Sequence, residues 1–338
     1  FDIIIGNPPY NSQGNIKVPT NKNSKKTEDG KSVWRDFIIK AISLLKQNSG
    51  YLNFIIPSIW MKPDRFRMYH FLTQYKLDKI HCFTNTETNQ IFKGEAQTPT
   101  CYFLLRREFA DLYNSENNND GSRLLTLFDK NQEKYINYKL LSGYPIPVFG
   151  SSIIQKLISF VKIHGCIQAI KTNEPIQDLE FYPERTNKYK FPCIISATLK
   201  KQEPIELSLK TNYCTESPPF YGESKLILAH KMFGFPILDL QGNWGISKRD
   251  NYIILDKSKT NLTKIQQFLS TYFALYVFES TRYRMKYLEK YAFQFLPDIT
   301  KISDFPSTIN DTTIAEYFGF SLQEKNAIMT LHNKKYFG

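Results

Sequence analysis

The first ten residues, FDIIIGNPPY, constrain the fold more than any other segment of this 338-residue chain. Residues 1–5 form a short, β-branched apolar run that Gly6 ends, a pattern typical of a buried strand. Pro8 and Pro9 follow, and they fix the backbone φ angle and remove two backbone hydrogen-bond donors. The segment therefore predicts a strand that ends in a rigid, irregular loop, at the carboxyl edge where open α/β sheets bind ligands.

Apolar strands and helical patterns alternate through the first third of the sequence. Strands are predicted over residues 51–56, 79–83 and 100–105, and helices over residues 32–47 and 63–75. This alternation predicts an α/β fold with a doubly wound, mostly parallel sheet. The last two strands are linked by residues 84–99, for which no helix is predicted, so that pair is expected to be an antiparallel hairpin.

The sequence pattern changes after the prolines Pro145 and Pro147. Helices are predicted over residues 151–162, 266–278, 281–293, 313–318 and 321–332, and short strands over residues 225–228 and 252–255. Capping-box spacings, Thr313 to Glu316 and Ser321 to Glu324, accompany the last two helices. We therefore expect a catalytic α/β domain over residues 1–148, an α+β domain over residues 149–305 and a helical tail over residues 306–338.

The charge of the chain favours a polyanionic partner. Lysines and arginines number 44 against 32 acidic residues, which gives a formal net charge of +12. An excess of this size is typical of proteins that bind nucleic acid. A basic surface without a specific ligand would give the same count, so charge alone leaves both interpretations open.

The apolar runs and the cysteines indicate the environment of the protein. No apolar run approaches the roughly 20 residues of a membrane-spanning helix, and the start of the chain does not resemble a secretory signal. The five cysteines are scattered, odd in number and without a Cys-x-x-Cys pair, so neither a disulfide framework nor a zinc site is predicted. We expect a cytoplasmic protein in a reducing compartment.

The loop after the first strand also has the chemistry to hold a planar amino group. The amide oxygen of Asn7 and the carbonyl of Pro8 can both point outward as acceptors, one for each hydrogen of an exocyclic amino group. Accepting both hydrogens favours a tetrahedral nitrogen, whose lone pair can attack an electrophilic methyl group. Tyr10 offers a ring on which an extruded base can stack, worth ~1–3 kcal/mol in single-strand binders. The alternative is a Pro-Pro turn next to a core tyrosine.

Asn7-Pro8-Pro9-Tyr10 resembles the catalytic motif of the adenine-specific DNA methyltransferases of type II restriction–modification systems, in the subgroup whose cofactor motif comes first and whose target-recognition region comes last. The resemblance implies that Asn7 and Pro8 bind the target amino group and that Tyr10 stacks on the flipped adenine. It also implies S-adenosylmethionine as cofactor, double-stranded DNA as partner, and a sheet that is the C-terminal half of a Rossmann-like methyltransferase domain.

The resemblance continues beyond the first loop. Residues 50–57 (GYLNFIIP) are similar to the family's next strand, and residues 91–94 (IFKG) to its aromatic loop before the last hairpin. That similarity implies that Phe92 packs against the extruded base; the alternative is a phenylalanine in the core of the hairpin. The family's glycine-rich cofactor loop precedes the catalytic motif, and no Gly-x-Gly pattern occurs in this sequence. We therefore expect an upstream segment or subunit to supply the cofactor loop, and the chain to be part of a longer polypeptide or assembly.

The region after residue 148 carries the predicted DNA contacts. On a helix over residues 281–293, Tyr283, Tyr287 and Tyr291 would form one stripe and Arg282, Lys286 and Lys290 an adjacent one. We predict that Arg282, Arg284 and Lys286 contact DNA, together with Lys231 from residues 228–234. The alternative is that the tyrosines pack in the core and the cations are only solvated.

Three functions fit this sequence. The leading hypothesis is site-specific adenine methylation of duplex DNA, with the base flipped out of the helix, as part of a restriction–modification system. Methylation of RNA bases or of a glutamine side-chain amide is a second enzymatic alternative, because Asn-Pro-Pro-Tyr serves several planar amino groups. A non-catalytic DNA-binding or assembly subunit on a methyltransferase scaffold is the third.

Overall fold

A computed structural model describes residues 1–12, 32–94, 96, 98–110, 122–172, 179–200, 206–229, 235–246, 251–284 and 288–333. The chain divides into two compact units. Unit 1 comprises Phe1–Ser151 with Arg282–Met285, and unit 2 comprises Ser152–Thr281 with Lys286–Gly338. None of the helices in the described ranges is both long and apolar enough to span a lipid bilayer.

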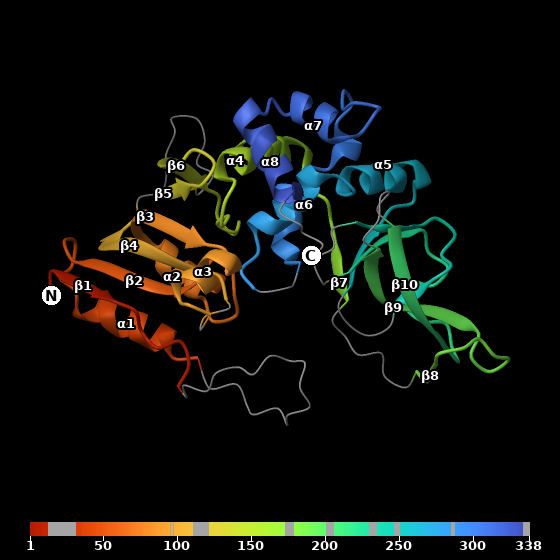
Figure 1. Ribbon diagram of the computed structural model, residues 1–338, viewed down its shortest axis with the longest axis horizontal. Coiled ribbons are helices and arrows are strands. Elements are labelled where there is room, and N and C mark those ends of the chain that lie inside the picture. The colour runs from red at the N-terminus through yellow and green to blue at the C-terminus, as the bar shows by residue number, and fades with distance from the viewer. Residues whose placement is uncertain are drawn as a thin grey trace. The chain divides into compact units, whose positions relative to one another are not determined.

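Unit 1 is built on a six-stranded sheet with the order β1-β2-β4-β3-β5-β6 (Figure 1). The strands are β1 (Ile3–Gly6), β2 (Tyr51–Pro57), β3 (Tyr75–Phe83), β4 (Thr100–Phe109), β5 (Arg123–Asp129) and β6 (Lys134–Leu140). Four short helices accompany them: α1 (Trp34–Leu44), the 3₁₀ turn η1 (Ser58–Met61), α2 (Met68–Thr73) and α3 (Asn85–Ile91). Strand β1 and α1 therefore lead into β2 as a parallel crossover, as the alternating pattern predicts.

The sheet is mixed: β1, β2, β3 and β5 run in one direction, and β4 and β6 run against them. The predicted common direction is thus found for most strands, although most neighbouring pairs are antiparallel. Neighbours β1–β2 and β3–β5 are parallel, whereas β2–β4, β3–β4 and β5–β6 are antiparallel. Where an antiparallel pair is consecutive in the chain, as β3–β4 and β5–β6 are, a local return joins the two strands and no crossover is needed. Residues 130–133 form a turn between β5 and β6, and the predicted antiparallel pairing of β3 with β4 is confirmed.

The connection between β3 and β4 contains a helix that was not predicted from the sequence. Helix α3 begins after Thr84, whose hydroxyl accepts a hydrogen bond from the Glu87 backbone N–H, while the Glu87 carboxylate accepts one from the Thr84 N–H at 2.7 Å. This is a complete capping box. The Thr-x-x-Glu spacing of residues 84–87 is therefore the signal by which α3 could have been predicted.

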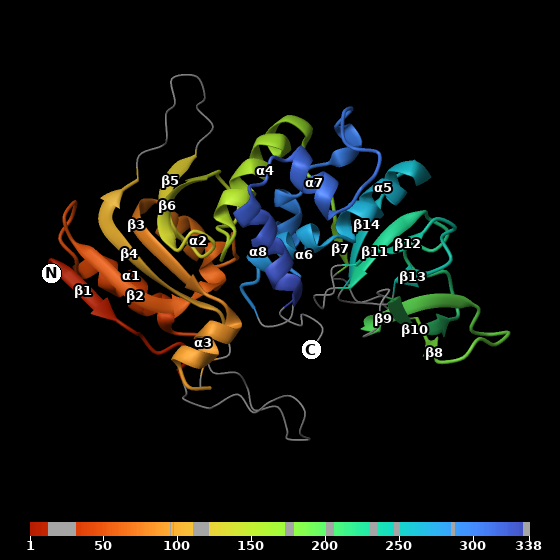
Figure 2. The same ribbon diagram turned by 45° about the horizontal axis from the view of Figure 1, so that its top comes forward.

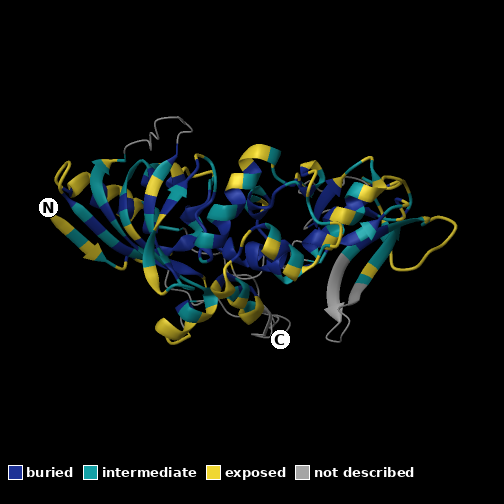
Figure 3. Ribbon diagram, turned by 90° about the horizontal axis from the view of Figure 1, so that it is seen from above, coloured by how far each residue is buried: buried dark blue, intermediate teal, exposed yellow. Residues whose placement is uncertain are grey.

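One face of this sheet is buried and the other is half-exposed. Along β2 and β4, Leu52, Phe54, Phe103 and Leu105 are buried while the residues between them are partly accessible, as the two-residue period of a strand requires. On β1, Ile3 and Ile5 are 60% and 76% exposed, and Figure 3 shows exposed residues on this strand beside the N-terminus.

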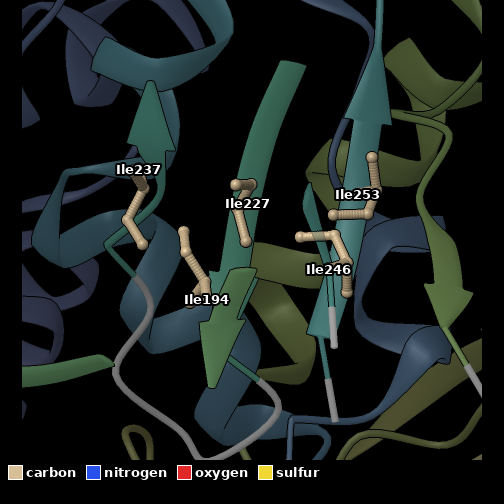
Figure 4. Packing of buried hydrophobic residues seen from close by; sticks show 5 residues of the cluster. All are labelled: Ile194, Ile227, Ile237, Ile246 and Ile253. Atoms are coloured by element: carbon tan, nitrogen blue, oxygen red, sulfur yellow. The ribbon is translucent and has the colours of Figure 1, made fainter. Parts of the chain in front are cut away.

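Unit 2 contains two small sheets and most of the helices. The strands are β7 (Ile170–Thr172), β8 (Phe181–Tyr182), β9 (Phe191–Lys200), β10 (Glu206–Cys214), β11 (Lys225–Ala229), β12 (Ile237–Asp239), β13 (Gly245–Ile246) and β14 (Asn251–Leu255). They form the sheets β13-β9-β10-β8 and β12-β11-β14-β7. Five isoleucines from these strands pack together as a core cluster (Figure 4): Ile194, Ile227, Ile237, Ile246 and Ile253. An apolar cluster of this kind joins strands of both sheets in one interior.

The helices described in unit 2 are α4 (Ser151–His164), α5 (Lys259–Leu269), α6 (Tyr272–Ser280), η2 (Lys290–Phe295), η3 (Ile299–Lys301), α7 (Asp311–Tyr317) and α8 (Leu322–Asn333). They differ from the predicted helices at three places. The helix predicted over residues 266–278 is two helices, because Thr271 caps α6 by accepting from the Ala274 N–H. Helix α7 is capped by Asn310 with Thr313, and the predicted Thr313–Glu316 box is wrong. The Ser321–Glu324 box is confirmed by bonds of 2.7 and 3.2 Å.

The third difference is the helix predicted over residues 281–293. Residues 281–284 and 288–289 are not helical, and the chain continues as the 3₁₀ turn η2. The buried Tyr283 hydroxyl donates a 2.6 Å hydrogen bond to the carbonyl of Ile146, which ties residue 283 to unit 1. This bond joins Tyr283 to a residue 137 positions earlier, and the helix predicted over residues 281–293 is not found in the described part of the segment.

Candidate functional site

The strand register places the first loop and α3 at the same edge of the unit 1 sheet. Gly6 pairs with Phe54 near the end of β2, Pro57 pairs with Thr100 at the start of β4, and Phe83 at the end of β3 also pairs with Thr100. The carboxyl ends of β1, β2 and β3 therefore meet at one edge. In Figure 2 the arrow of β1 points toward the end of the sheet at which α3 lies.

The four residues Asn7 to Tyr10, here called the motif loop, leave the sheet at this edge. Asn7 is exposed, Pro8 is buried, Pro9 is exposed and Tyr10 is half-buried. The Tyr10 carbonyl accepts a hydrogen bond of 3.1 Å from the Val33 N–H, just before α1. Local bonding thus fixes the end of the loop, while the Asn7 amide stays accessible to a ligand.

The Tyr10 side chain is suited to stacking and not to acid–base chemistry. Its hydroxyl is buried and has no hydrogen-bond partner among the described residues. Burial, with a smaller contribution from the Cys101 thiol, raises the pKa of Tyr10 far above its ordinary value. The phenol is therefore neutral at physiological pH, and its ring is the part that can contribute to binding.

Phe92 lies at the end of α3 on the same edge. Its N–H donates to the Thr88 carbonyl at 2.9 Å, and the ring is half-buried. Helix α3 is held to the sheet because the hydroxyls of Thr88 and Thr100 lie 3.0 Å apart and the Thr100 N–H donates to Thr88 Oγ1 at 3.2 Å. The structure therefore brings Phe92 and the motif loop to one edge, and base contact by Phe92 stays a prediction.

The glutamate that caps α3 also binds a lysine of the next hairpin. Lys130, in the turn after β5, forms an ion pair with Glu87. Burial raises the pKa of Glu87, but the hydrogen bonds and charge of Lys130 and the bonds from Thr84 outweigh it and lower the pKa below its usual range. This carboxylate consequently stays ionised and holds the start of α3 in place.

The predicted DNA contacts of the C-terminal region are only partly described. Lys231 and Lys286 lie outside the described residues. Arg282 is half-buried and Arg284 is exposed, and neither lies on a helix. The buried Tyr283 fits the alternative in which the tyrosine is a core residue. DNA contact by these cations stays a prediction, whereas the helix that suggested it is wrong for residues 281–284 and 288–289.

A pair of cations that contact one aromatic ring in unit 1 was not predicted from the sequence. The guanidinium carbon of Arg35 lies 3.5 Å from the centre of the Phe66 ring, and that of Arg65 lies 4.5 Å from it. Arg35 and Phe66 are far apart in sequence, so no spacing rule joins them. Within the described parts of the chain, no group of three or more histidine, cysteine or acidic side chains could hold a metal ion.

The first part of the chain matches a family model. Residues 1–92 match the Eco57I restriction-modification methylase family, which places the motif loop, α1, β2, β3 and α3 inside the match. This match covers the candidate site and ends at Phe92. The class of protein to which unit 1 is similar is therefore a methylase of a restriction–modification system.

Individual relatives agree with this class. The chain is 32% identical over 139 residues to the type II restriction enzyme and methyltransferase RM.Eco57I of Escherichia coli, covering 38% of this chain and 13% of that protein. It is 29% identical over 113 residues to an uncharacterized adenine-specific methylase of Mycoplasma pneumoniae, covering 32% of this chain and 24% of the relative. The chain thus spans less than a quarter of each of these relatives.

A solved structure also resembles the chain in outline. The type IIL restriction-modification enzyme MmeI, in complex with DNA, aligns over 98% of this chain and 54% of that enzyme. The TM-score is 0.40 and the sequence identity is 10%, so this likeness carries no argument about the site.

Proposed function

We propose that this chain carries the base-binding site of an adenine-specific DNA methyltransferase in a restriction–modification system. The observation that carries the proposal is the motif loop itself. An exposed Asn7 amide stands beside the buried Pro8 and the neutral Tyr10 ring, at the carboxyl edge of a sheet. The match of residues 1–92 to a restriction-modification methylase family supports it.

The residues of the motif loop and Phe92 contact different parts of the target base. Asn7 and Pro8 offer oxygen acceptors to the two hydrogens of the target amino group, which directs the nitrogen lone pair away from the ring. Tyr10 and Phe92 offer aromatic faces to a base that has left the DNA stack. Since burial keeps the Tyr10 phenol neutral, this residue offers the base its ring and no negative charge.

The methyl donor implied by the family is S-adenosylmethionine, which supplies an electrophilic methyl group when bound. The described residues fit the acceptor side of this transfer. They do not show a glycine-rich cradle for the donor, because the glycines of unit 1 in the described ranges stand singly and the whole sequence has no Gly-x-Gly pattern. We therefore assign no residue of this chain to holding the donor.

Replacing Asn7 tests the proposed chemistry. We expect Asn7→Ala to lower methyl transfer to duplex DNA by about 100-fold or more, the usual effect of removing one hydrogen-bonding group from a reacting centre. DNA binding should remain, because the exposed Asn7 does not support the fold. Transfer is measured as radiolabel in N6-methyladenine, and Asn137→Ala, at an exposed asparagine of β6, is the matched control.

Two substitutions at Tyr10 separate stacking from hydrogen bonding. Tyr10→Phe should keep transfer near the wild-type rate, since the hydroxyl has no partner in the described part of the chain. Tyr10→Ala removes the ring and should weaken base binding by ~1–3 kcal/mol. Unchanged transfer in Asn7→Ala, or equal loss in both Tyr10 variants, would overturn the assigned roles.

Competition with RNA and protein substrates tests the alternatives. Duplex DNA should bind more tightly than RNA of the same sequence, because the chain is strongly basic and similar to DNA-modifying enzymes. Duplex binding without transfer, measured with the wild-type chain joined to the segment or subunit that supplies the cofactor loop, would instead support the non-catalytic subunit.

A further inference from the structure

Three arginines and one phenylalanine, all exposed except the half-buried Arg35, form a cationic surface in unit 1, here called the arginine cluster. Arg35 is the second residue of α1, and Arg65, Phe66 and Arg67 lie in the turn between η1 and α2. Phe66 is 53% exposed, although its ring is contacted by the guanidinium groups of Arg35 and Arg65 at 3.5 and 4.5 Å. A large aromatic side chain exposed in this way and covered by cations indicates a binding surface more than a core contact.

A backbone hydrogen bond and the course of the chain join this cluster to the motif loop. The Tyr10 carbonyl binds the Val33 N–H at 3.1 Å, and Arg35 follows two residues later at the start of α1. Turn η1 follows β2 directly, and β2 ends at the same sheet edge as the motif loop. The arginine cluster therefore flanks the site where the proposed base enters.

The turn that carries the cluster is rigid, and its acidic residue is already engaged. Both carboxylate oxygens of Asp64 accept backbone N–H groups, from Phe66 at 2.6 Å and from Tyr69 at 3.4 Å. Arg67 adopts a left-handed φ of 58°, and its N–H donates to the Asp64 carbonyl at 3.1 Å. The local bonding thus presents Phe66 and both arginines in a defined arrangement.

The guanidinium groups keep their hydrogen-bond donors. Among the residues that the structure describes, Arg35, Arg65 and Arg67 form no ion pair. Stacking on an aromatic face holds the plane of a guanidinium without using its N–H groups, which remain able to bind a phosphate through two parallel bonds. Arg35 and Arg65, which are oriented in this way, match the charge and geometry of phosphodiester groups, and Arg67 adds a third exposed cation.

We propose that the arginine cluster binds backbone phosphates of duplex DNA beside the nucleotide whose base enters the site at Asn7 and Tyr10. This inference rests on the proposed methyltransferase function. It names the surface that binds the DNA backbone next to the target base. Extruding a base costs a few kcal/mol of pairing and stacking, and phosphate contacts hold the strand in register while it is extruded. Phe66 is a positioning residue, because it fixes the two guanidinium groups and does not itself bind the phosphates.

The salt dependence of duplex binding tests this surface. Removing one phosphate contact should lower the slope of log K against log salt concentration by about 0.9, so the triple variant Arg35→Gln/Arg65→Gln/Arg67→Gln should lower it by roughly 2.7. Binding is followed by fluorescence anisotropy of a labelled duplex with the whole chain. Lys40→Gln, at an exposed lysine further along α1, removes one charge from the same helix and should leave the slope near wild type.

Phe66→Leu separates orientation from charge. It keeps all three cations, so we expect the salt slope to stay near wild type while affinity falls by a smaller factor than in the triple variant. Single variants at the exposed Arg65 and Arg67 keep the test decisive if the triple variant unfolds, because neither side chain supports the core. Each should lower the slope by up to about 0.9.

The outcomes distinguish this inference from the proposed function. If the triple variant keeps the wild-type salt slope and affinity, and methyl transfer is intact, the proposed phosphate binding by the arginine cluster is wrong and the proposed function still stands. Weaker duplex binding by the triple variant with a reduced salt slope, while Asn7→Ala still binds, supports phosphate binding by the arginine cluster. A wild-type protein that binds no duplex DNA would overturn both.

Discussion

The two units bury their strands and their charges differently. In unit 1 the strands alternate between buried and half-exposed residues, and its ion pairs lie on the accessible face, such as Lys76 with Glu108 at 30% and 29% exposure. In unit 2 strands β11 and β14 are buried along most of their length. There the pair Lys225–Asp239 is 2.8 Å long and fully inaccessible.

This difference shows that burial, and not residue type, separates the cations that can bind a ligand from those that build the fold. Lys225 donates to Asp239 and to the Glu223 carbonyl at 2.9 Å. Asp239 also accepts the N–H groups of Asn243 and Trp244 at 2.8 and 3.0 Å, so the pair fixes the turn after β12. The exposed Arg65 and Arg67 of unit 1 form no ion pair of this kind with the residues that the structure describes.

The largest expected effect is on the buried pair. Lys225→Met leaves the Asp239 carboxylate buried without its cation, and we expect it to lower the free energy of unfolding by about 3–5 kcal/mol. Lys76→Met, the matched change at a half-exposed pair of unit 1, should cost at most about 1 kcal/mol. Urea unfolding followed by tryptophan fluorescence measures both.

The tryptophans identify the unit that is affected. Trp34 and Trp60 lie in unit 1 and Trp244 lies in unit 2, so replacing Trp244 or the other two with phenylalanine isolates each signal. Lys225→Met should shift the Trp244 transition and leave the signal of Trp34 and Trp60 near wild type. An equal cost for Lys225→Met and Lys76→Met would remove the proposed distinction between the units.

In unit 1 the sequence predicted what local signals determine. The apolar run before Gly6 and the two prolines predicted β1 and the irregular loop, because strand burial and proline geometry act over a few residues. The insertion of β4 between β2 and β3 was missed, since it depends on where each connection returns to the sheet. The contact of Arg35 with Phe66 was also missed, because tertiary packing alone brings residues 31 positions apart together.

After residue 148 the same reasoning failed where helical spacing did not correspond to one continuous helix. The tyrosines and cations of residues 282–291 recur at helical spacing, yet Tyr283 is fixed by a bond to Ile146, 137 residues away. Likewise, the apolar run over residues 266–278 was continuous in pattern, but the Thr271 hydroxyl starts a new helix within it. Long-range bonds and internal caps therefore decided the structure where periodicity did not.

A smaller effect is expected from removing the cap of α3. Thr84→Ala removes the hydroxyl that accepts the Glu87 N–H, and we expect a loss of stability of about 1 kcal/mol. Ser258→Ala removes the equivalent cap of α5 in unit 2, where the hydroxyl accepts the Asn261 N–H, and should cost a similar amount. Only Thr84→Ala should also lower methyl transfer, because α3 presents Phe92 at the candidate site. Equal transfer in the two variants would contradict a role for Phe92 in base binding.

The smallest expected effect is the pH response of His81 on the half-exposed face of unit 1. Its ring stacks on Phe128 at 4.1 Å, and its Nδ1 lies 3.1 Å from the Tyr102 hydroxyl. Burial lowers the pKa of His81 in the folded chain, and the charge of Lys130 lowers it further. The charge of Glu87 has a smaller, opposite effect on this pKa. The neutral ring is thus favoured by folding, so its contribution to stability is complete above the ordinary histidine value of about 6.5 and is lost as the pH falls below it.

The unit 1 unfolding transition should therefore weaken between about pH 7 and pH 5, above the range in which carboxylates protonate. His81→Phe keeps a ring that can stack on Phe128 but cannot be protonated, so it should flatten the response of the Trp34 and Trp60 signal over this interval. The Trp244 signal serves as the internal control, since His81 belongs to unit 1. If acidification shifted only the Trp244 transition, or if the variant kept the full response, His81 would not be the group that makes the accessible face of unit 1 sensitive to pH.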